Sequence, residues 1–309
     1  MKELVEKLIQ NQISEWPLAA QNFDALAKVQ SKDIDVRGIR YRAQFNPARI
    51  TSSAAKVDTK SIQERKCFLC SANRPKEQMG IRHGEYEILI NPFPIFPRHL
   101  TIPDVSHVDQ VISGRVGDML EFAELLSDYV IFYNGPKCGA SAPDHMHFQA
   151  GNKGFLGIEK DVEELGKELI FTHKSASVYV LDDSPRNALI FKSNDISDLE
   201  EAFNKVYELL PLHEDDIEPM MNILAWFANG EWILAVLPRV KHRPSCFFAE
   251  TDAKMTISPA SVDLGGVFIT PIESDFNRID SSKIDEILSE VSMSKAELLE
   301  YLTPLKSVK

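Results

Sequence analysis

The chain has 309 residues, enough for one large domain or two ordinary ones, and its 44% hydrophobic and 26% charged residues are typical of a globular rather than a disordered chain. Its formal net charge of −12 excludes a general affinity for nucleic acid or for an anionic membrane surface, because both need a basic protein surface. A small phosphorylated ligand in a local basic pocket is compatible with that charge.

The sequence has no run that approaches the roughly 18 apolar residues of a membrane span. Its first residues mix charged with apolar positions, unlike the apolar core of a signal peptide. Four cysteines are too few for the disulfide framework of a secreted protein. We therefore expect a cytoplasmic protein without a membrane or nucleic-acid partner, whose thiols are reduced or bound to metal.

The hydrophobic pattern predicts a mixture of helices and short strands. Helical spacing predicts helices over residues 4–9, 108–128, 197–210 and 280–305, and alternation predicts strands over 85–91, 129–133, 145–149, 177–181, 188–192, 221–228 and 231–237. Asn229-Gly230, between the last two strands, is a strong signal for a two-residue hairpin turn. Residues 38–66 have the pattern of an irregular segment. Together these features favour an α+β fold over a doubly wound parallel sheet, with a boundary near residues 151–157.

Cys67-Phe68-Leu69-Cys70 is a Cys-x-x-Cys hook. Such a hook either binds zinc, carries out redox chemistry, or consists of two incidental thiols in a turn. The other two cysteines are isolated, so a tetrahedral zinc site would take its remaining ligands from histidines or carboxylates. The histidines that stand out are His99 and the pair His145 and His147.

The segment His145-Met146-His147-Phe148-Gln149 is the most informative part of the sequence. On a β-strand, His145, His147 and Gln149 would share one face about 6.6 Å apart, while Met146 and Phe148 would face a core. Three polar groups on one side of such a strand indicate an active-site wall or a metal site. A solvated strand face with two accidental histidines is the alternative.

Residues 134–144, Asn-Gly-Pro-Lys-Cys-Gly-Ala-Ser-Ala-Pro-Asp, form a loop of small residues directly before this segment. Small residues let backbone amides approach a phosphate closely, and Lys137 and Ser141 would add side-chain donors. An ordinary Gly/Pro turn is the alternative interpretation. The position of the loop before His-x-His-x-Gln favours the phosphate site.

In combination, the Cys-x-x-Cys hook, a histidine after an extended strand, Asn134-Gly135, the small-residue loop and His-x-His-x-Gln resemble the galactose-1-phosphate uridylyltransferase group of the histidine-triad superfamily. That group includes dinucleoside-polyphosphate phosphorylases and GDP-hexose phosphorylases, and the resemblance covers about residues 46–151. It implies an α+β fold of two histidine-triad-like halves, each a mainly antiparallel sheet with packed helices. The catalytic half would span residues 1–155 and a degenerate second half residues 156–309.

The resemblance also implies a role for individual residues. A zinc ion would be held by Cys67, Cys70, His99 and His145, and the substrate would be bound by Asn134, Gly135, Lys137 and Ser141. His147 would attack the α-phosphorus, and Gln149 would hydrogen-bond the transferring phosphoryl group. Neutral imidazole is nucleophilic near its pKa of about 6.5, and a nucleotidyl-histidine splits one displacement into two easier ones. We expect one ring nitrogen of His147 to donate to a backbone carbonyl, which sets the tautomer for attack.

Apolar residues at positions 146 and 148, where the uridylyltransferases usually have Pro and Gly, favour the phosphorylase branches. The expected function is the transfer of a nucleoside monophosphate from a nucleotide-sugar or dinucleoside polyphosphate to phosphate or a sugar phosphate. Because enzymes of the group it resembles often form dimers, a homodimer is a further expectation. Two alternatives stay open: a nucleotide hydrolase of the same superfamily, and a non-catalytic zinc-stabilised nucleotide-binding module. Lys241-His242-Arg243 would either reach substrate phosphates or form a solvated loop.

Overall fold

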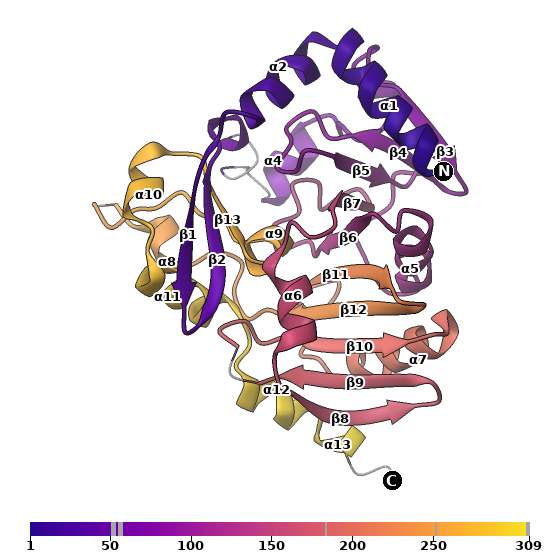
Figure 1. Cartoon of the computed structure of the whole chain (residues 1–309), viewed down its shortest axis with the longest axis vertical. Helices are drawn as coiled ribbons and strands as arrows, with labels where there is room; N and C mark the ends of the chain where they lie inside the picture. The colour runs from indigo at the N-terminus through magenta and orange to yellow at the C-terminus, as the bar shows by residue number, and fades with distance from the viewer. Residues whose placement is uncertain (51–53, 55–57, 183, 251, 307–309) are drawn as a thin grey trace.

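The computed structural model describes residues 1–50, 54, 58–182, 184–250 and 252–306. Within these residues, ten strands form one continuous antiparallel sheet that runs along the length of the molecule (Figure 1). From one edge to the other they are β3 (Gly80–His83), β4 (Tyr86–Ile90), β5 (His99–Pro103), β7 (His147–Asn152), β6 (Tyr129–Asn134), β11 (Met221–Ala228), β12 (Glu231–Pro238), β10 (Leu189–Ser193), β9 (Ala176–Leu181) and β8 (Lys167–His173).

The sheet consists of two five-stranded halves with the same internal order. If the strands of each half are numbered along the chain, both halves have the order 1-2-3-5-4, and their fourth strands, β6 and β11, pair at the centre from Ile131↔Ala225 to Asn134↔Asn222. The predicted α+β fold with two mainly antiparallel halves is confirmed. The proposed division between residues 155 and 156 falls in the connection between β7 and the next helix.

Helices lie at both ends of the chain and over both faces of the sheet (Figure 1). They are α1 (Lys2–Glu15), α2 (Pro17–Leu26), α4 (Thr59–Glu64), α5 (Val116–Leu125), α6 (Gly157–Glu164), α7 (Ile196–Tyr207), α8 (Ser245–Phe248), α9 (Ser261–Leu264), α10 (Glu273–Arg278), α11 (Ser281–Val291), α12 (Lys295–Tyr301) and α13 (Thr303–Lys306), with 3₁₀ turns at Pro47–Arg49 and Ser71–Asn73. None of the helices in the described residues is long and apolar enough to span a bilayer.

The long sheet separates two hydrophobic cores because side chains alternate between the faces of a strand. Along β6, Ile131 and Tyr133 belong to the core that includes α1, α5 and α7, whereas Val130 and Phe132 belong to the core on the other face. A central strand that is buried on both sides reads as a continuous apolar run, as β6 does.

A second, three-stranded sheet packs beside the second core. It consists of β1 (Gln30–Val36), β2 (Ile39–Phe45) and β13 (Val267–Thr270), and β13 pairs in parallel with β2 although the two strands lie far apart in the sequence. This sheet contributes Tyr41 and Phe268 to the core, with their ring centroids 6.0 Å apart. Segments from both ends of the chain therefore meet over the face of the long sheet that carries the site described below.

The predicted hairpin at Asn229-Gly230 is confirmed, with both residues in the left-handed region at φ of 55° and 81°. The prediction of an irregular segment over 38–66 is wrong for β2 and α4, and its residues 51–53 and 55–57 lie outside the described part. The helix predicted from residue 108 begins only at Val116, after Gly114 at φ +72°. The predicted terminal helix is broken into α11, α12 and α13.

The strand predicted over residues 145–149 begins two residues late, at His147. His145 lies in the preceding bend, where its backbone N–H donates to the carbonyl of Ala142 at 3.1 Å. The prediction that Met146 and Phe148 face a core is confirmed, because both are buried in the core with α5. His145 therefore lies before the strand and is not part of the strand face that carries His147 and Gln149.

Candidate active site and metal cluster

A cavity of about 500 Å³ lies over the face of the sheet that carries His147 and Gln149. The first half of the chain lines it with the end of β6, the start of β7, the small-residue loop after β6, the segment 91–95 and the turn between α1 and α2. The second half lines it with residues 242–243, 258–263 and Ile269. The cavity is large enough for a nucleotide and is built from both halves.

His147 is held as a neutral imidazole with a defined tautomer. Its side chain is 4% exposed, and burial lowers its pKa to about 4. Nδ1 lies 2.8 Å from the backbone carbonyl oxygen of His145, which only accepts, so Nδ1 carries the proton. The lone pair of Nε2 is then left for the cavity, which confirms the expected donation to a backbone carbonyl and gives the imidazole the tautomer of a nucleophile.

Gln149 has its amide oriented by two neighbours. Its Oε1 accepts from Nδ2 of Asn91 at 3.4 Å and lies 3.1 Å from Nε2 of His99. The Nδ1 atom of His99 accepts from the backbone N–H of Ile95 at 3.1 Å, so its Nε2 carries the proton and donates to Gln149. With Oε1 occupied, the group that Gln149 presents to a ligand is its NH₂.

Asn134 is oriented in the same way from the second half. Its Oδ1 accepts from the backbone N–H and the hydroxyl of Ser261, at 2.8 and 2.6 Å, and from Nδ2 of Asn222 at 2.9 Å. Its Nδ2 is then the donor available to the cavity that Asn134 lines. Two amide donors, from Asn134 and Gln149, thus flank His147, which suits the oxygens of a phosphoryl group.

Gln110 joins the last residue of β6, Asn134, to the first residue of β7, His147. Its Nε2 donates to the carbonyls of Asn134 and His147 at 3.0 and 3.1 Å, and its Oε1 accepts from the N–H of His147 at 2.7 Å. The β6–β7 ladder ends at the pair Phe132↔Gln149, so the side chain of Gln110 takes the place of the next rung. It fixes the backbone of His147.

The other predicted substrate residues are divided by the structure. Ser141 lines the cavity, whereas neither Gly135 nor Lys137 is among the lining residues. Gly135 packs against β11, where a Cβ would lie 2.9 Å from the carbonyl oxygen of Met221. Lys137 forms an ion pair with Asp216. Gly135 and Lys137 thus make contacts outside the lining of the cavity.

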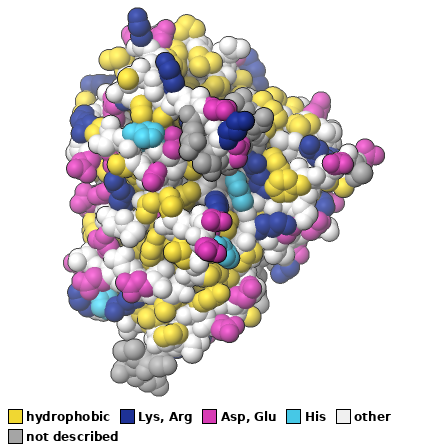
Figure 2. Space-filling model, turned by 180° about the vertical axis from the view of Figure 1, so that it is seen from behind, with side chains coloured by type: hydrophobic (Ala, Val, Ile, Leu, Met, Phe, Trp, Pro, Cys, Tyr) yellow, Lys and Arg dark blue, Asp and Glu magenta, His cyan; other side chains and the backbone are white. Residues whose placement is uncertain are grey.

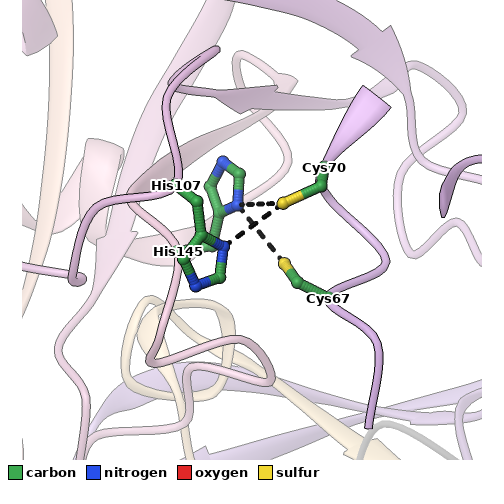
Figure 3. A group of neighbouring side chains, drawn as sticks. All are labelled: Cys67, Cys70, His107 and His145. Atoms are coloured by element: carbon green, nitrogen blue, oxygen red, sulfur yellow. Dashed lines mark hydrogen bonds between the residues drawn. The ribbon is translucent and has the colours of Figure 1, made fainter. Parts of the chain in front are cut away.

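Two thiols and two imidazoles form a cluster (Figure 3), and Phe68 and Leu69 between the two thiols line the cavity. Its members are Cys67, Cys70, His107 and His145, whose ligand atoms all lie within 4.8 Å of one another. Nδ1 of His145 lies 3.3 Å from Sγ of Cys67 and 3.6 Å from Sγ of Cys70, and Nδ1 of His107 lies 3.2 Å from Sγ of Cys70. A tetrahedral zinc ion separates its sulfur and nitrogen ligands by about 3.5 Å, so these distances fit such an ion.

The cluster has the surroundings of a metal site. Nε2 of His145 lies 2.8 Å from the carbonyl oxygen of Asp104, which places the proton on Nε2 and the lone pair on Nδ1, toward the thiols. Burial alone would raise the pKa of Cys67, but the contact with His145 and hydrogen bonds from the backbone of Leu69 and Cys70 lower it to about 6. A thiolate is the form that binds metal.

The prediction of His99 as a metal ligand is wrong. His99 lies on β5 and is completely buried with both ring nitrogens engaged, to Ile95 and Gln149. Burial lowers its pKa to about 3, and the nearby Arg49 contributes in the same direction. His107 takes its place because β5 runs antiparallel to β7, with Pro103 opposite His147, so the chain just after β5 lies beside the chain just before β7. His107 follows β5 and His145 precedes β7.

The cavity is positively charged although the whole chain is acidic. Arg49, Arg65 and Arg243 line it, and Asp263 is the one carboxyl group among the described lining residues. Burial raises the pKa of Asp263 to about 6, and its oxygens accept from the backbone N–H groups of Ala260 and Ile269. On the face shown in Figure 2, by contrast, acidic, basic and apolar side chains are interspersed. The local charge of the cavity favours an anionic ligand.

Comparisons with known proteins agree with this geometry. Residues 8–152 match a family described as a domain of unknown function, DUF4922, and residues 161–302 match the GDPGP1-like C-terminal domain. Diadenosine 5′,5‴-P1,P4-tetraphosphate phosphorylase 2 of Saccharomyces cerevisiae is 24% identical over 165 residues, which are 47% of this chain. The chain spans half the length of this curated relative.

The fold is that of a solved relative. The crystal structure of yeast Ap4A phosphorylase Apa2 matches with a TM-score of 0.64 and 17% identity over 92% of this chain and 97% of that one, and its complex with Ap4A matches with a TM-score of 0.60 and 16% identity over the same shares. The predicted resemblance to the galactose-1-phosphate uridylyltransferase, dinucleoside-polyphosphate phosphorylase and GDP-hexose phosphorylase group is confirmed.

Proposed function

We propose that this chain, similar along both halves to that group, is a nucleotidyltransferase of the phosphorylase type. It transfers a nucleoside monophosphate from a dinucleoside polyphosphate or a nucleotide-sugar to phosphate or a sugar phosphate. The observation that carries the proposal is the neutral His147, with Nδ1–H bound to the carbonyl of His145 and with Nε2 left for a cationic cavity. The proposal agrees with the name of the yeast relative, a phosphorylase of diadenosine tetraphosphate.

The reaction follows from the positions of these groups. The lone pair of His147 Nε2 forms a bond to the α-phosphorus, while the phosphoryl–oxygen bond to the leaving group breaks and that group departs with the electron pair. The NH₂ groups of Gln149 and Asn134 donate to the phosphoryl oxygens, where negative charge concentrates during the displacement. The acceptor oxygen then attacks the same phosphorus, and the nitrogen–phosphorus bond returns its electrons to the imidazole.

We propose that Cys67, Cys70, His107 and His145 hold one zinc ion. Four protein ligands make a closed site, so zinc would supply structure and not a reactive water. It would fix His145, whose carbonyl oxygen accepts from His147, and so would hold the nucleophile in place. The cytoplasmic location expected from the composition and the homodimer expected from the family resemblance belong to the same proposal.

The test is to trap the covalent intermediate. Wild-type protein is incubated with nucleotide donors that carry a labelled α-phosphorus, quenched in base, and digested to locate an acid-labile adduct. We expect the adduct on His147 and its absence, with loss of turnover and an unchanged thermal melt, in His147→Ala. His173→Ala is the matched control, because His173 lies on β8 at the far edge of the sheet and pairs with Glu201.

The outcomes separate the alternatives. Substantial turnover by His147→Ala would refute the covalent mechanism. Discharge of the adduct by water at the same rate with or without phosphate and sugar phosphate would instead indicate the hydrolase. Nucleotide binding without any adduct or turnover would indicate the non-catalytic binding module.

A further inference from the structure

The second half of the chain supplies a wall of the cavity that the reaction described so far does not use. This wall consists of residues 242–243, which come after β12, and residues 258–263 before and within α9. Of Lys241-His242-Arg243, the last two line the cavity, whereas Lys241 forms an ion pair with Glu290. The basic segment is therefore divided, with one cation at the surface and one in the site.

This wall is built around Arg239, whose side chain is almost completely buried. One guanidinium nitrogen of Arg239 donates to the carbonyls of Lys241 and His242, both at 2.9 Å, and another donates to the carbonyl of Pro259 at 3.0 Å. Arg239 thus fixes both segments of the wall at once. A site held in advance by such bonds loses little conformational entropy when a ligand binds.

This wall contacts the small-residue loop of the first half, residues 134–144. Gly139 has φ of +96°, and a Cβ there would lie 2.6 Å from Cβ of Ala260, so the two loops are in direct contact at a position that needs glycine. Arg239 also donates to Oδ1 of Asn222 at 2.7 Å, and Asn222 and Ser261 both donate to Asn134. The two walls of the cavity are linked by buried hydrogen bonds.

Arg243 is the cation that this arrangement presents to the cavity. Its Nε donates to Oγ of Ser258 at 2.9 Å, and its guanidinium lies 4.2 Å from the ring centroid of Phe247. His242 beside it is a neutral group at neutral pH, because burial and the neighbouring Arg243 lower its pKa to about 4. A guanidinium with a neutral imidazole and a hydroxyl nearby matches the oxygens of a phosphate group.

We propose that Arg243, with His242 and Ser258, binds the phosphate group of the acceptor in the second step. The same residues bind the phosphate group of the leaving group in the first step. This rests on the proposed function, in which entering and leaving groups occupy the same side of the α-phosphorus, away from His147. In the second step an acceptor phosphate oxygen forms its bond to the α-phosphorus, the nitrogen–phosphorus bond breaks, and His147 Nε2 recovers its electron pair. The phosphate that Arg243 binds is common to inorganic phosphate and to a sugar phosphate.

The experiment uses a donor whose leaving group carries no phosphate, a nucleoside 5′-phosphorofluoridate. His147 displaces fluoride, which leaves with the electron pair of the phosphorus–fluorine bond, and an acceptor then discharges the adduct. In single-turnover reactions, we expect Arg243→Gln to lower the ratio of the rate constant for phosphate-dependent discharge of the adduct to that for fluoride release by roughly 10- to 100-fold, the effect of losing a charge-assisted hydrogen bond. Parallel reactions with inorganic phosphate and with a hexose 1-phosphate distinguish the two acceptors.

Two further variants control for folding and for charge. Lys241→Gln removes the neighbouring cation that pairs with Glu290, and we expect its ratio to equal that of wild type. Arg243→Lys keeps the charge and should recover part of the loss. An unchanged ratio and an unchanged KM for phosphate in Arg243→Gln would overturn the proposal, and so would loss of fluoride release with the ratio preserved. Failure of wild type to release fluoride would overturn the proposed function itself.

Discussion

Gln110→Ala tests whether one buried side chain holds the catalytic strand in place. Gln110 is 0% exposed and makes three hydrogen bonds, two to carbonyl oxygens of Asn134 and His147 and one from the N–H of His147. Its removal leaves three buried backbone groups without partners. At about 1 kcal/mol for each group, the free energy of unfolding should fall by about 3 kcal/mol. For a chain of this length that corresponds to a decrease in Tm of about 5 °C.

The same substitution should slow the reaction more than it weakens substrate binding. Gln110 contacts the backbone of His147 and not the cavity, so its loss should leave KM nearly unchanged while kcat falls by roughly 10- to 100-fold through misplacement of the nucleophile. Both constants are measured well below the Tm of the variant, together with equilibrium unfolding in urea.

Gln12→Ala is the matched control. Gln12 is an equally buried glutamine, whose Nε2 donates to the carbonyl of Glu77 at 2.8 Å and whose Oε1 accepts from the N–H of Met79 at 2.9 Å. Because Glu77 and Met79 are exposed, their freed backbone groups can bind water, and Gln12→Ala should destabilise the protein less than Gln110→Ala, with kcat retained. Equal loss of kcat in both variants, or an unchanged free energy of unfolding in Gln110→Ala, would refute the reasoning.

Two further predictions concern the metal cluster and a buried carboxyl group. His107→Ala should abolish stoichiometric zinc binding, measured by elemental analysis of the purified protein. His99→Ala should retain zinc but lower kcat, because Gln149 is no longer oriented. The opposite pattern of zinc content would restore His99 as the ligand. Burial raises the pKa of Glu218 to about 7, so its protonated form is favoured in the folded state; its stabilising contribution is present below pH 4.5 and is lost as the pH rises through 7. The free energy of unfolding of wild type relative to Glu218→Gln should therefore fall by up to about 3 kcal/mol between pH 4.5 and pH 8. Equal pH dependence of the two proteins in urea unfolding would show that Glu218 does not titrate in this way.

Local patterns predicted those parts of the fold and site that depend on neighbouring residues. Alternation indicated the inner strands, Asn229-Gly230 indicated its hairpin, and the spacing in His-x-His-x-Gln brought His147 and Gln149 to one face of β7. These features depend on backbone geometry within a few residues. The tautomer of His147 could be expected for the same reason, because its hydrogen-bond acceptor is only two residues away.

Features that depend on strand order were missed. His107 joins Cys67, Cys70 and His145 because β5 and β7 are antiparallel neighbours, and a sequence does not display that pairing. His99 follows an extended segment and stood out as a ligand in the sequence, yet its ring lies beside Gln149. Asn222 and Ser261 act on Asn134 across the junction of the two halves, and no pattern in either half indicates a contact between them.

Because β6 pairs with β11 at the centre of the long sheet, each half of the chain covers an edge strand of the other half. If the chain were cut near residue 155, β6 would become an open edge strand, as would β11, and the first fragment would also lose β13 from beside β2. An open apolar edge recruits another strand, and the nearest equivalent is the same strand of a second copy. A separated half would therefore self-associate through β6 or aggregate. Covalent linkage of the two halves therefore replaces the assembly of separate subunits. It keeps β6 and β11 paired at an effective concentration that is set by the chain and does not depend on the concentration of the protein in the cell.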